Sequence, residues 1–195
     1  MRRIGIMGGT FNPIHKGHIA LAKAAQKAFA LSQVIFIPSG TPPHKALDEI
    51  IDKEERLKMV RLAIKGIKKF SVSRIEIDRP GYSYAVDTFR ALRRKYGAKT
   101  KLFYIMGLDS INEILEWKKP LELFKLCEFI AGTRPGHRVA KIPQLNKVAD
   151  RIHFIGLGED ISASEIRRKI VKGGKVGKLV PKAVADYIKK RGLYK

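Results

Sequence analysis

The chain alternates short, continuously apolar runs with longer stretches in which apolar residues recur every three or four positions. The short runs are typical of buried parallel strands, and the longer stretches are typical of amphipathic helices. The pattern predicts strands at residues 4–7, 34–37, 70–77, 102–106, 128–131 and 152–155. It predicts helices at 16–30, 53–67 and 83–96, a shorter one before Trp117, one starting at Ser162 and one starting at Pro181.

Strands that alternate with helices predict right-handed βαβ crossovers and therefore a parallel sheet with helices on both faces. We expect a Rossmann-like α/β fold, with strand order 3-2-1-4-5 and a sixth strand added. The 195 residues contain no repeat and no long linker, so we expect a single domain over residues 1–195. Ligands of such sheets bind beyond the carboxyl ends of the strands, where the strand order reverses. The loops at Gly8-Gly9-Thr10 and Gly107-Leu108-Asp109 are then expected to face one crevice.

The first strand leads into a stretch that is suited to bind phosphate. Glycines follow the strand and a helix begins near Lys16, so backbone N–H groups can approach an anion there. The stretch has neither the Gly-Lys-Ser/Thr of a Walker A loop nor the GxGxxG spacing of a dinucleotide site. His15 and His18 stand three positions apart, with Gly17 between them, so both imidazoles can reach one anion. On these residues alone, a metal-binding pair and two ordinary surface histidines remain alternatives.

The whole stretch resembles the signature of the nucleotidyltransferases with an HxGH motif, and within them it is most similar to the nicotinate-nucleotide adenylyltransferases. The matching residues are Gly8-Gly9-Thr10-Phe11-Asn12-Pro13-Ile14-His15-Lys16-Gly17-His18. That family commonly has aspartate where this chain has Asn12. Ser162-Ala163-Ser164-Glu165-Ile166-Arg167 resembles its second ATP motif and also has the spacing of a helix capping box. The resemblance extends from residue 4 to residue 194.

The resemblance implies adenylyl transfer from ATP to nicotinate mononucleotide, which gives nicotinate adenine dinucleotide and pyrophosphate in NAD biosynthesis. This displacement at phosphorus needs positioning and electrostatic stabilisation rather than a protein nucleophile. The implied catalytic residues are His15, His18 and Arg167. The implied ATP-binding residues are Gly8, Gly9, Thr10, Phe11, Gly107, Asp109, Ser162, Ser164 and Arg134. Mg²⁺ is expected on the substrate phosphates, with no metal site built by the protein.

The nicotinate side carries three further matches to the family. The loop at residues 38–45 provides His44 and Lys45 for the mononucleotide phosphate. Ser83-Tyr84-Ala85 matches a Ser-Tyr-Thr motif, but Ala85 lacks the hydroxyl. Trp117 could stack on the pyridine ring or belong to the core. Main-chain N–H groups near Ala85 and Lys118 are implied to meet the acid group of the ring.

The formal net charge of +22 is unevenly distributed, with eleven Lys/Arg and one acid from Arg167 onward. Such a chain could bind nucleic acid, attract a polyanionic small substrate or carry a solvated surface. Because aromatic residues are few and no RNA- or DNA-binding motif appears, we expect no specific nucleic-acid partner. The nearest enzymatic alternative, pantetheine-phosphate adenylyltransferase, has threonine in place of His15 and is shorter.

The remaining composition indicates a protein of the cytoplasm. No run of 18 apolar residues exists, and the N-terminal run reads as a strand rather than a signal peptide, so we expect no membrane partner. The one cysteine, Cys127, cannot form an internal disulfide, and its apolar surroundings favour a buried, inert thiol. The sequence leaves the oligomeric state open, a homo-oligomer included.

Overall fold

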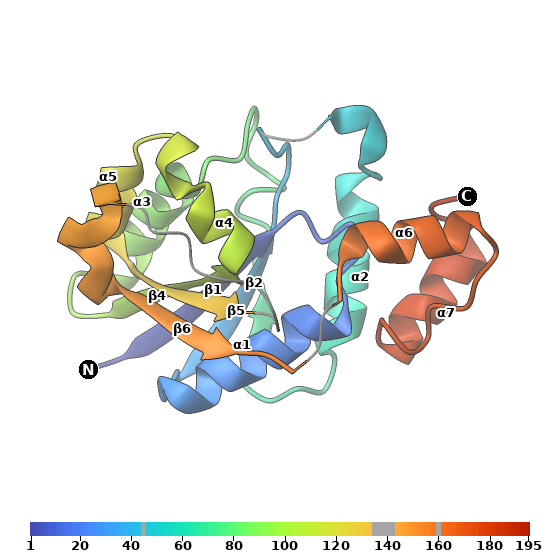
Figure 1. The fold of residues 1–195 in the computed structure, drawn as a ribbon, viewed down its shortest axis with the longest axis horizontal. Coiled ribbons are helices and arrows are strands. Elements are labelled where there is room, and N and C mark those ends of the chain that lie inside the picture. The colour runs from blue at the N-terminus through green and yellow to red at the C-terminus, as the bar shows by residue number, and fades with distance from the viewer. Residues whose placement is uncertain (44–45, 134–142, 159–160) are drawn as a thin grey trace.

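The computed structural model describes residues 1–43, 46–133, 143–158 and 161–195. Its centre is a six-stranded sheet in the order β3-β2-β1-β4-β5-β6, with every neighbouring pair parallel (Figure 1). This confirms the predicted Rossmann-like fold and strand order. The strands are β1 (Arg3–Gly9), β2 (Gln33–Pro38), β3 (Phe70–Val72), β4 (Lys101–Gly107), β5 (Glu128–Thr133) and β6 (Ile152–Gly156).

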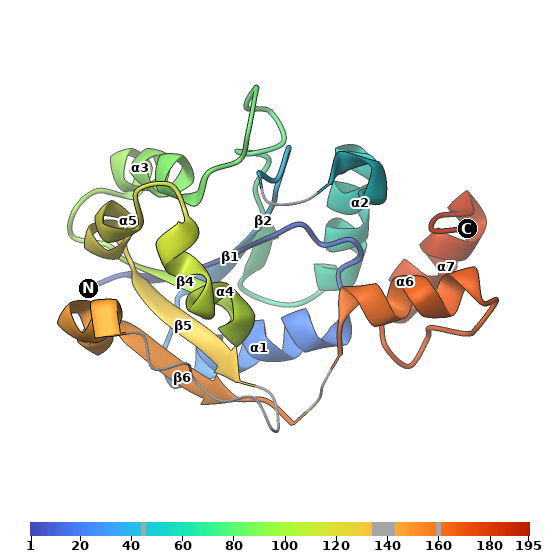
Figure 2. The ribbon, with the colours of Figure 1, turned by 45° about the horizontal axis from the view of Figure 1, so that its top comes forward.

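Helices connect the strands and cover both faces of the sheet. The α-helices are α1 (Lys16–Ala28), α2 (Lys53–Ile64), α3 (Ala85–Tyr96), α4 (Leu108–Asn112), α5 (Pro120–Leu126), α6 (Ala163–Val171) and α7 (Lys182–Arg191). Short 3-10 helices are η1 (Leu47–Glu49), η2 (Ile114–Glu116) and η3 (Pro143–Arg151). Helices α1 and α2 lie on one face and α3, α4 and α5 on the other, while α6 and α7 lie beside α2 (Figure 2).

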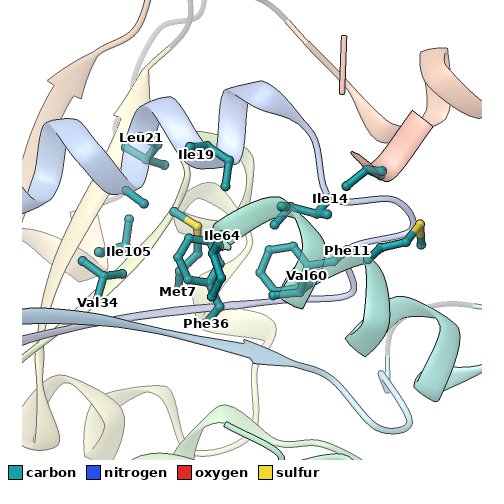
Figure 3. Packing of buried hydrophobic residues seen from close by; sticks show 14 of the residues in the cluster. Met7, Phe11, Ile14, Ile19, Leu21, Val34, Phe36, Val60, Ile64 and Ile105 are labelled. Atoms are coloured by element: carbon teal, nitrogen blue, oxygen red, sulfur yellow. The ribbon is translucent and has the colours of Figure 1, made fainter. Parts of the chain in front are cut away.

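Alternate residues of the strands supply two separate cores, because successive side chains of a strand point to opposite faces. On the α1 and α2 face, Met7, Val34, Phe36 and Ile105 pack with helix residues such as Ile19 (Figure 3). The opposite core contains Ile4, Ile6, Ile35, Ile37, Phe89, Leu92, Leu102, Tyr104, Phe124, Cys127 and Phe129. The sheet is therefore buried on both sides, as its continuously apolar strands predict.

Cys127 lies in this second core, as predicted. Its side chain is buried, and burial raises the pKa of the thiol well above its usual value. The thiol lies 3.5 Å from the carbonyl of Leu123, to which it donates. It is therefore a packing residue. No helix in the described parts of the chain is long and apolar enough to cross a membrane.

The predicted strand at residues 70–77 is wrong beyond Val72. Only Phe70–Val72 pairs with β2, and the chain then turns, with the N–H of Asp78 bonded to the carbonyl of Arg74 at 2.9 Å. Arg74 also forms ion pairs with Glu54 and Asp78, both at 2.7 Å. The last backbone bond to β2 runs from the N–H of Ser73 to the carbonyl of Phe36 at 2.9 Å, and the turn follows it. The alternation of apolar residues past Val72 therefore reflects a packed turn.

The C-terminal helices dock on α2 through one carboxylate. Glu55 of α2 accepts a hydrogen bond from the Tyr187 hydroxyl at 2.7 Å and another from Arg191 at 2.6 Å. The loop before α7 is held as well, because Leu179 accepts a bond from the N–H of Lys16 at 2.9 Å. The bonds from Arg191 and Tyr187 hold the pKa of Glu55 below its ordinary value.

We expect Glu55→Gln to lower the thermal unfolding midpoint at pH 7 by a few degrees. A carboxylate whose pKa is depressed in the folded state stabilises above its unfolded pKa, and this contribution is lost as the pH falls through the folded pKa. The difference between wild type and variant should therefore shrink below about pH 4.5 and vanish at lower pH. Glu116→Gln, at an exposed carboxylate, is the control. A difference between wild type and Glu55→Gln that is independent of pH would contradict the ionic docking.

Candidate active site

A cleft with a volume of about 530 Å³ opens at the carboxyl ends of the central strands. Both predicted loops contribute to it, the one after β1 and the one after β4, so the expected crevice is confirmed. Sixteen of the predicted site residues line this cleft: Gly8, Gly9, Thr10, Phe11, His15, His18, Ser83, Tyr84, Ala85, Gly107, Asp109, Trp117, Lys118, Ser162, Ser164 and Arg167. His44, Lys45 and Arg134 lie outside the described residues.

The two histidines of the motif stack on each other at the start of α1. Their ring centroids are 3.7 Å apart, and the ring of His18 also meets the edge of Phe11 at 5.1 Å. His15 is buried and His18 is half-buried. A Cβ atom added at Gly17 would lie 3.1 Å from Nδ1 of His15, tighter than ordinary contact. The absence of a side chain at Gly17 therefore leaves space for the ring of His15.

The backbone fixes the orientation of His18. The N–H of His15 lies 3.2 Å from Nδ1 of His18 and donates to it. A ring nitrogen that accepts a hydrogen bond carries no proton, so this contact assigns the proton of a neutral His18 to Nε2. Nε2 is then a donor, held in place by the turn that starts the helix. A donor of this kind suits an oxygen that gains negative charge.

Arg167 joins the second motif to the first. Its guanidinium donates to the carbonyl of Asn12 at 3.0 Å and lies 3.4 Å from the hydroxyl of Ser164. The predicted cap of α6 is present, because the Ser162 hydroxyl accepts the N–H of Glu165 at 3.1 Å. A helix N-terminus, two serines and an arginine thus face the same cleft as the histidines. These groups together suit a polyphosphate.

Asn12, the residue that departs from the family pattern, has a structural role in this chain. It is 5% exposed, and its amide donates to the carbonyl of Glu49 at 2.9 Å. Its side-chain oxygen lies 3.4 Å from the N–H of Ile51, which donates to it. An aspartate could accept the second bond but could not donate the first. The amide thereby fastens the segment before α2 to the phosphate loop.

On the opposite side of the cleft, Ser83 closes the loop that follows β2. Its hydroxyl accepts the N–H of Gly40 at 2.9 Å and that of Thr41 at 3.3 Å. Ala85 then starts α3, where the first amides of a helix lack intrahelical acceptors. The N-terminus of this twelve-residue helix provides a second place for an anion.

Aromatic and basic side chains border that helix start. Trp117 is half-buried and meets the ring of Tyr104 edge-on at 6.1 Å. It lines the cleft, so its ring is available to a ligand as well as to the core. Lys118 places its ammonium 4.2 Å from the ring centroid of Tyr84 and pairs with Asp87 at 3.2 Å. The lysine side chain is thus held beside the cleft by two partners.

The end of β4 leaves open space for a ligand. A Cβ atom added at Gly107 would meet no atom within 4 Å, so this backbone can be approached closely. Asp109 follows in the first turn of α4, and its side chain is exposed. A carboxylate in this place can accept hydrogen bonds from two adjacent hydroxyl groups.

Arg56 is a residue that the sequence reasoning missed. It is 1% exposed and donates to three backbone carbonyls, of Ile51 at 3.1 Å, Thr10 at 2.8 Å and Gly40 at 2.9 Å. It therefore ties the phosphate loop after β1 to the loop after β2, directly behind the cleft. A signal was present, because residue 56 lies four positions before Val60 on the apolar face of α2.

Glu76 was missed as well. This carboxyl lines the cleft and is 7% exposed, and burial raises its pKa despite a 2.6 Å hydrogen bond from Thr88. Arg79 lies 3.8 Å away. The periodicity offered no signal here, since residue 76 fell inside the strand wrongly predicted at 70–77.

The described residues contain no group of three or more His, Cys, Asp or Glu side chains that could hold a metal ion. His15 and His18 therefore stand as a pair, without a third side chain of these types beside them among the described residues.

Comparison with known proteins shows the family of the chain. The family model described as cytidylyltransferase-like matches residues 6–169. A protein from Moorella thermoacetica named probable nicotinate-nucleotide adenylyltransferase is 47% identical, over 99% of this chain and 92% of its own length. A protein of the same name from Thermoanaerobacter sp. strain X514 is 44% identical, over 99% of this chain and 94% of its own length.

Solved structures share the fold. The nicotinic acid mononucleotide adenylyltransferase of Plasmodium falciparum, complexed with NaAD, superposes with a TM-score of 0.82 at 20% identity. The match covers 100% of this chain and 98% of that one. At this identity the likeness supports the fold rather than the roles of residues.

We expect Arg56→Met to lower the free energy of unfolding by roughly 2–4 kcal/mol, because it leaves buried carbonyls without a donor. Arg56→Lys should recover only part of the loss, since one ammonium cannot reproduce three divergent bonds. Urea titration measures both variants, and Arg61→Met, on the exposed side of the same helix, is the control. Equal stability of Arg56→Met and Arg61→Met would show that the buried guanidinium does not brace the loops.

Proposed function

The chain belongs to the nicotinate-nucleotide adenylyltransferases, within the cytidylyltransferase-like family, and from this we propose how its cleft transfers the adenylyl group of ATP to nicotinate mononucleotide. The observation that carries the proposal is the meeting of the His15–His18 pair with Arg167 and the start of α6 in one cleft. Two motifs about 150 residues apart in sequence thereby face one polyphosphate-sized space.

The reaction is a displacement at phosphorus. A phosphate oxygen of nicotinate mononucleotide attacks the α-phosphorus of ATP and forms a new P–O bond. The bond from the α-phosphorus to the α,β-bridging oxygen breaks, and pyrophosphate leaves with the electron pair. Two anions have to be held together while charge accumulates on the oxygens around phosphorus, so donors and cations carry the catalysis.

We assign the α-phosphate to the histidines and the leaving pyrophosphate to α6. Nε2 of His18 donates to an α-phosphate oxygen, and His15, stacked on it, completes the cradle at the start of α1. Arg167 and Ser164 hold the β- and γ-phosphates, helped by the N-terminal amides of α6. Gly107 and Asp109 take the adenosine ribose, whose hydroxyl groups the carboxylate accepts.

The nicotinate ring then lies on the other side of the cleft, against α3. Trp117 stacks on the pyridine, and main-chain N–H groups at Ala85 and Lys118 meet its carboxylate. The helix start at Ala85 supports this arrangement, because its amides lack intrahelical partners and its dipole favours an anion. His44 and Lys45 complete the proposal as ligands of the mononucleotide phosphate, and Arg134 as a further contact of ATP.

Mg²⁺ enters as part of the substrate, bound to the phosphates of ATP, where it neutralises their charge. The protein is proposed to act in the cytoplasm, and its net charge of +22 to draw two polyanionic substrates toward the cleft.

We expect a clear preference for the acid over the amide. With ATP and Mg²⁺, nicotinate mononucleotide should be used on the order of 30- to 1000-fold better in kcat/KM than nicotinamide mononucleotide. Two N–H donors favour a carboxylate by roughly 2–4 kcal/mol, and about 1.4 kcal/mol is tenfold. Competing the acceptors at equal concentration and weighing the products tests this and the reaction together. An excess of the amide product would contradict the proposed ring pocket, and no dinucleotide from either acceptor would contradict the function.

We expect His18→Ala to lower kcat by about 10²–10³-fold, the scale for the loss of one transition-state donor. The KM for ATP should change much less, because the bond strengthens as charge develops. His153→Ala is the control, since His153 pairs with Glu128 at 2.9 Å on the far strands of the sheet. If kcat stays near normal in His18→Ala, the histidine is a structural residue.

A further inference from the structure

The hydroxyl of Tyr104 lies in the wall of the cleft. Tyr104 is on β4, directly opposite Ile6 of β1, and its ring leans toward the carboxyl end of the sheet. Its hydroxyl reaches over Gly8, where an added Cβ atom would lie only 2.8 Å from it. The glycine of the phosphate loop thus makes room for this phenol.

No hydrogen bond holds this hydroxyl within the residues that the structure describes, and Tyr104 is 9% exposed. Its ring is packed among aromatic rings, with centroids of Phe89 at 4.8 Å, Phe129 at 6.0 Å and Trp117 at 6.1 Å. The hydroxyl is not among the fully buried polar atoms, and Tyr104 lines the cleft, so the hydroxyl is accessible from the cleft. A hydroxyl that the neighbouring residues do not hold can bond a ligand there.

The position of Tyr104 indicates which part of the ligand its hydroxyl contacts. Its ring borders Trp117, and Tyr104, Trp117 and Ala85 line the same cleft. Arg167 and Ser164 belong to α6, which lies on the opposite side of the molecule from α3 (Figures 1 and 2). Ala85 itself offers no polar side-chain group, and the Ser83 hydroxyl is already bonded to the N–H groups of Gly40 and Thr41. Tyr104 adds a hydroxyl to this end of the cleft from the neighbouring wall.

We propose that the Tyr104 hydroxyl is a specificity-determining donor that bonds the carboxylate of the nicotinate ring. The inference rests on the proposed function, and adds a side-chain donor to the main-chain groups near Ala85 and Lys118. Burial raises the pKa of the phenol well above its ordinary value, so the group keeps its proton and can donate. A charged acceptor strengthens such a bond about twofold over a neutral one.

Glu76 explains why an additional donor is useful here. Its carboxyl lines the same cleft as Tyr104 and Ala85, and is held by Thr88 and by Arg79. Any negative charge on this group opposes the carboxylate of a ligand in this part of the cleft. Each neutral donor aimed at the ligand offsets part of that repulsion without bringing a cation that would pair with Glu76 instead.

The test is Tyr104→Phe, which removes one oxygen atom and keeps the ring. Binding of nicotinate and nicotinamide mononucleotides is measured by calorimetry, together with turnover and thermal unfolding of the free protein. We expect the Kd for nicotinate mononucleotide to rise about tenfold and that for the amide about threefold, as for loss of a charged and a neutral hydrogen bond. The KM for ATP should stay unchanged. The unfolding midpoint of the free variant should be equal or higher, because no hydrogen bond holds the lost hydroxyl within the described residues.

Tyr96→Phe, on the last turn of α3 and outside the cleft, is the matched control and should alter none of these values. Unchanged affinity for the acid in Tyr104→Phe, with normal turnover by the wild type, would overturn the assignment of the hydroxyl alone. A lower unfolding midpoint with equal loss for both mononucleotides would also overturn it, in favour of a packing role. Wild-type protein that binds and converts neither mononucleotide would overturn the proposed function, and this inference with it.

Discussion

The parallel pairing of β1 with β2 on one edge and with β4 on the other determines where the remaining parts of the site lie. After β1 the chain continues to β2 on one side, and after β4 it continues to β5 on the other side. The loops after β1 and β4 therefore separate and leave a cleft between them. Gly8 and Gly107 lie at the carboxyl ends of the two strands, and each serves this geometry differently. A side chain at Gly8 would collide with Tyr104, whereas Gly107 faces open space that a ligand can enter.

The cleft is held in shape by polar groups that are buried behind it. Arg56 and Asn12 bond the backbone of the loops rather than other charged side chains, so the loops keep their shape without a ligand. Burying a guanidinium against carbonyls alone is costly, and it is tolerated here because its three bonds are complete. Such preorganisation suits a reaction that depends on the alignment of two phosphates, as the proposed adenylyl transfer does.

The sequence predicted the order of the strands and the crevice between the loops after β1 and β4, and the failures have physical causes. Motif residues such as His15, His18 and Arg167 could be singled out because they belong to short motifs at the starts of two helices. Arg56 and Tyr104 could not, because their contacts depend on which loops and strands meet in three dimensions. The strand predicted through residue 77 ends at Val72, where the chain turns and the N–H of Asp78 bonds the carbonyl of Arg74, a local closure that a hydrophobic pattern does not contain.

The C-terminal helices bring the last part of the proposed phosphate site to the sheet, so this site is complete only when they are docked. Arg167 reaches Asn12 only because α6 lies against the phosphate loop. The backbone bond from Lys16 to Leu179 and the contacts of Glu55 with α7 hold it there. The same residue that begins α1, next to the histidine pair, is therefore also an anchor of the C-terminal segment. The proposed binding of pyrophosphate by α6 therefore depends on the docking of this segment, since a segment that undocks removes Arg167 and the amides of α6 from the cleft.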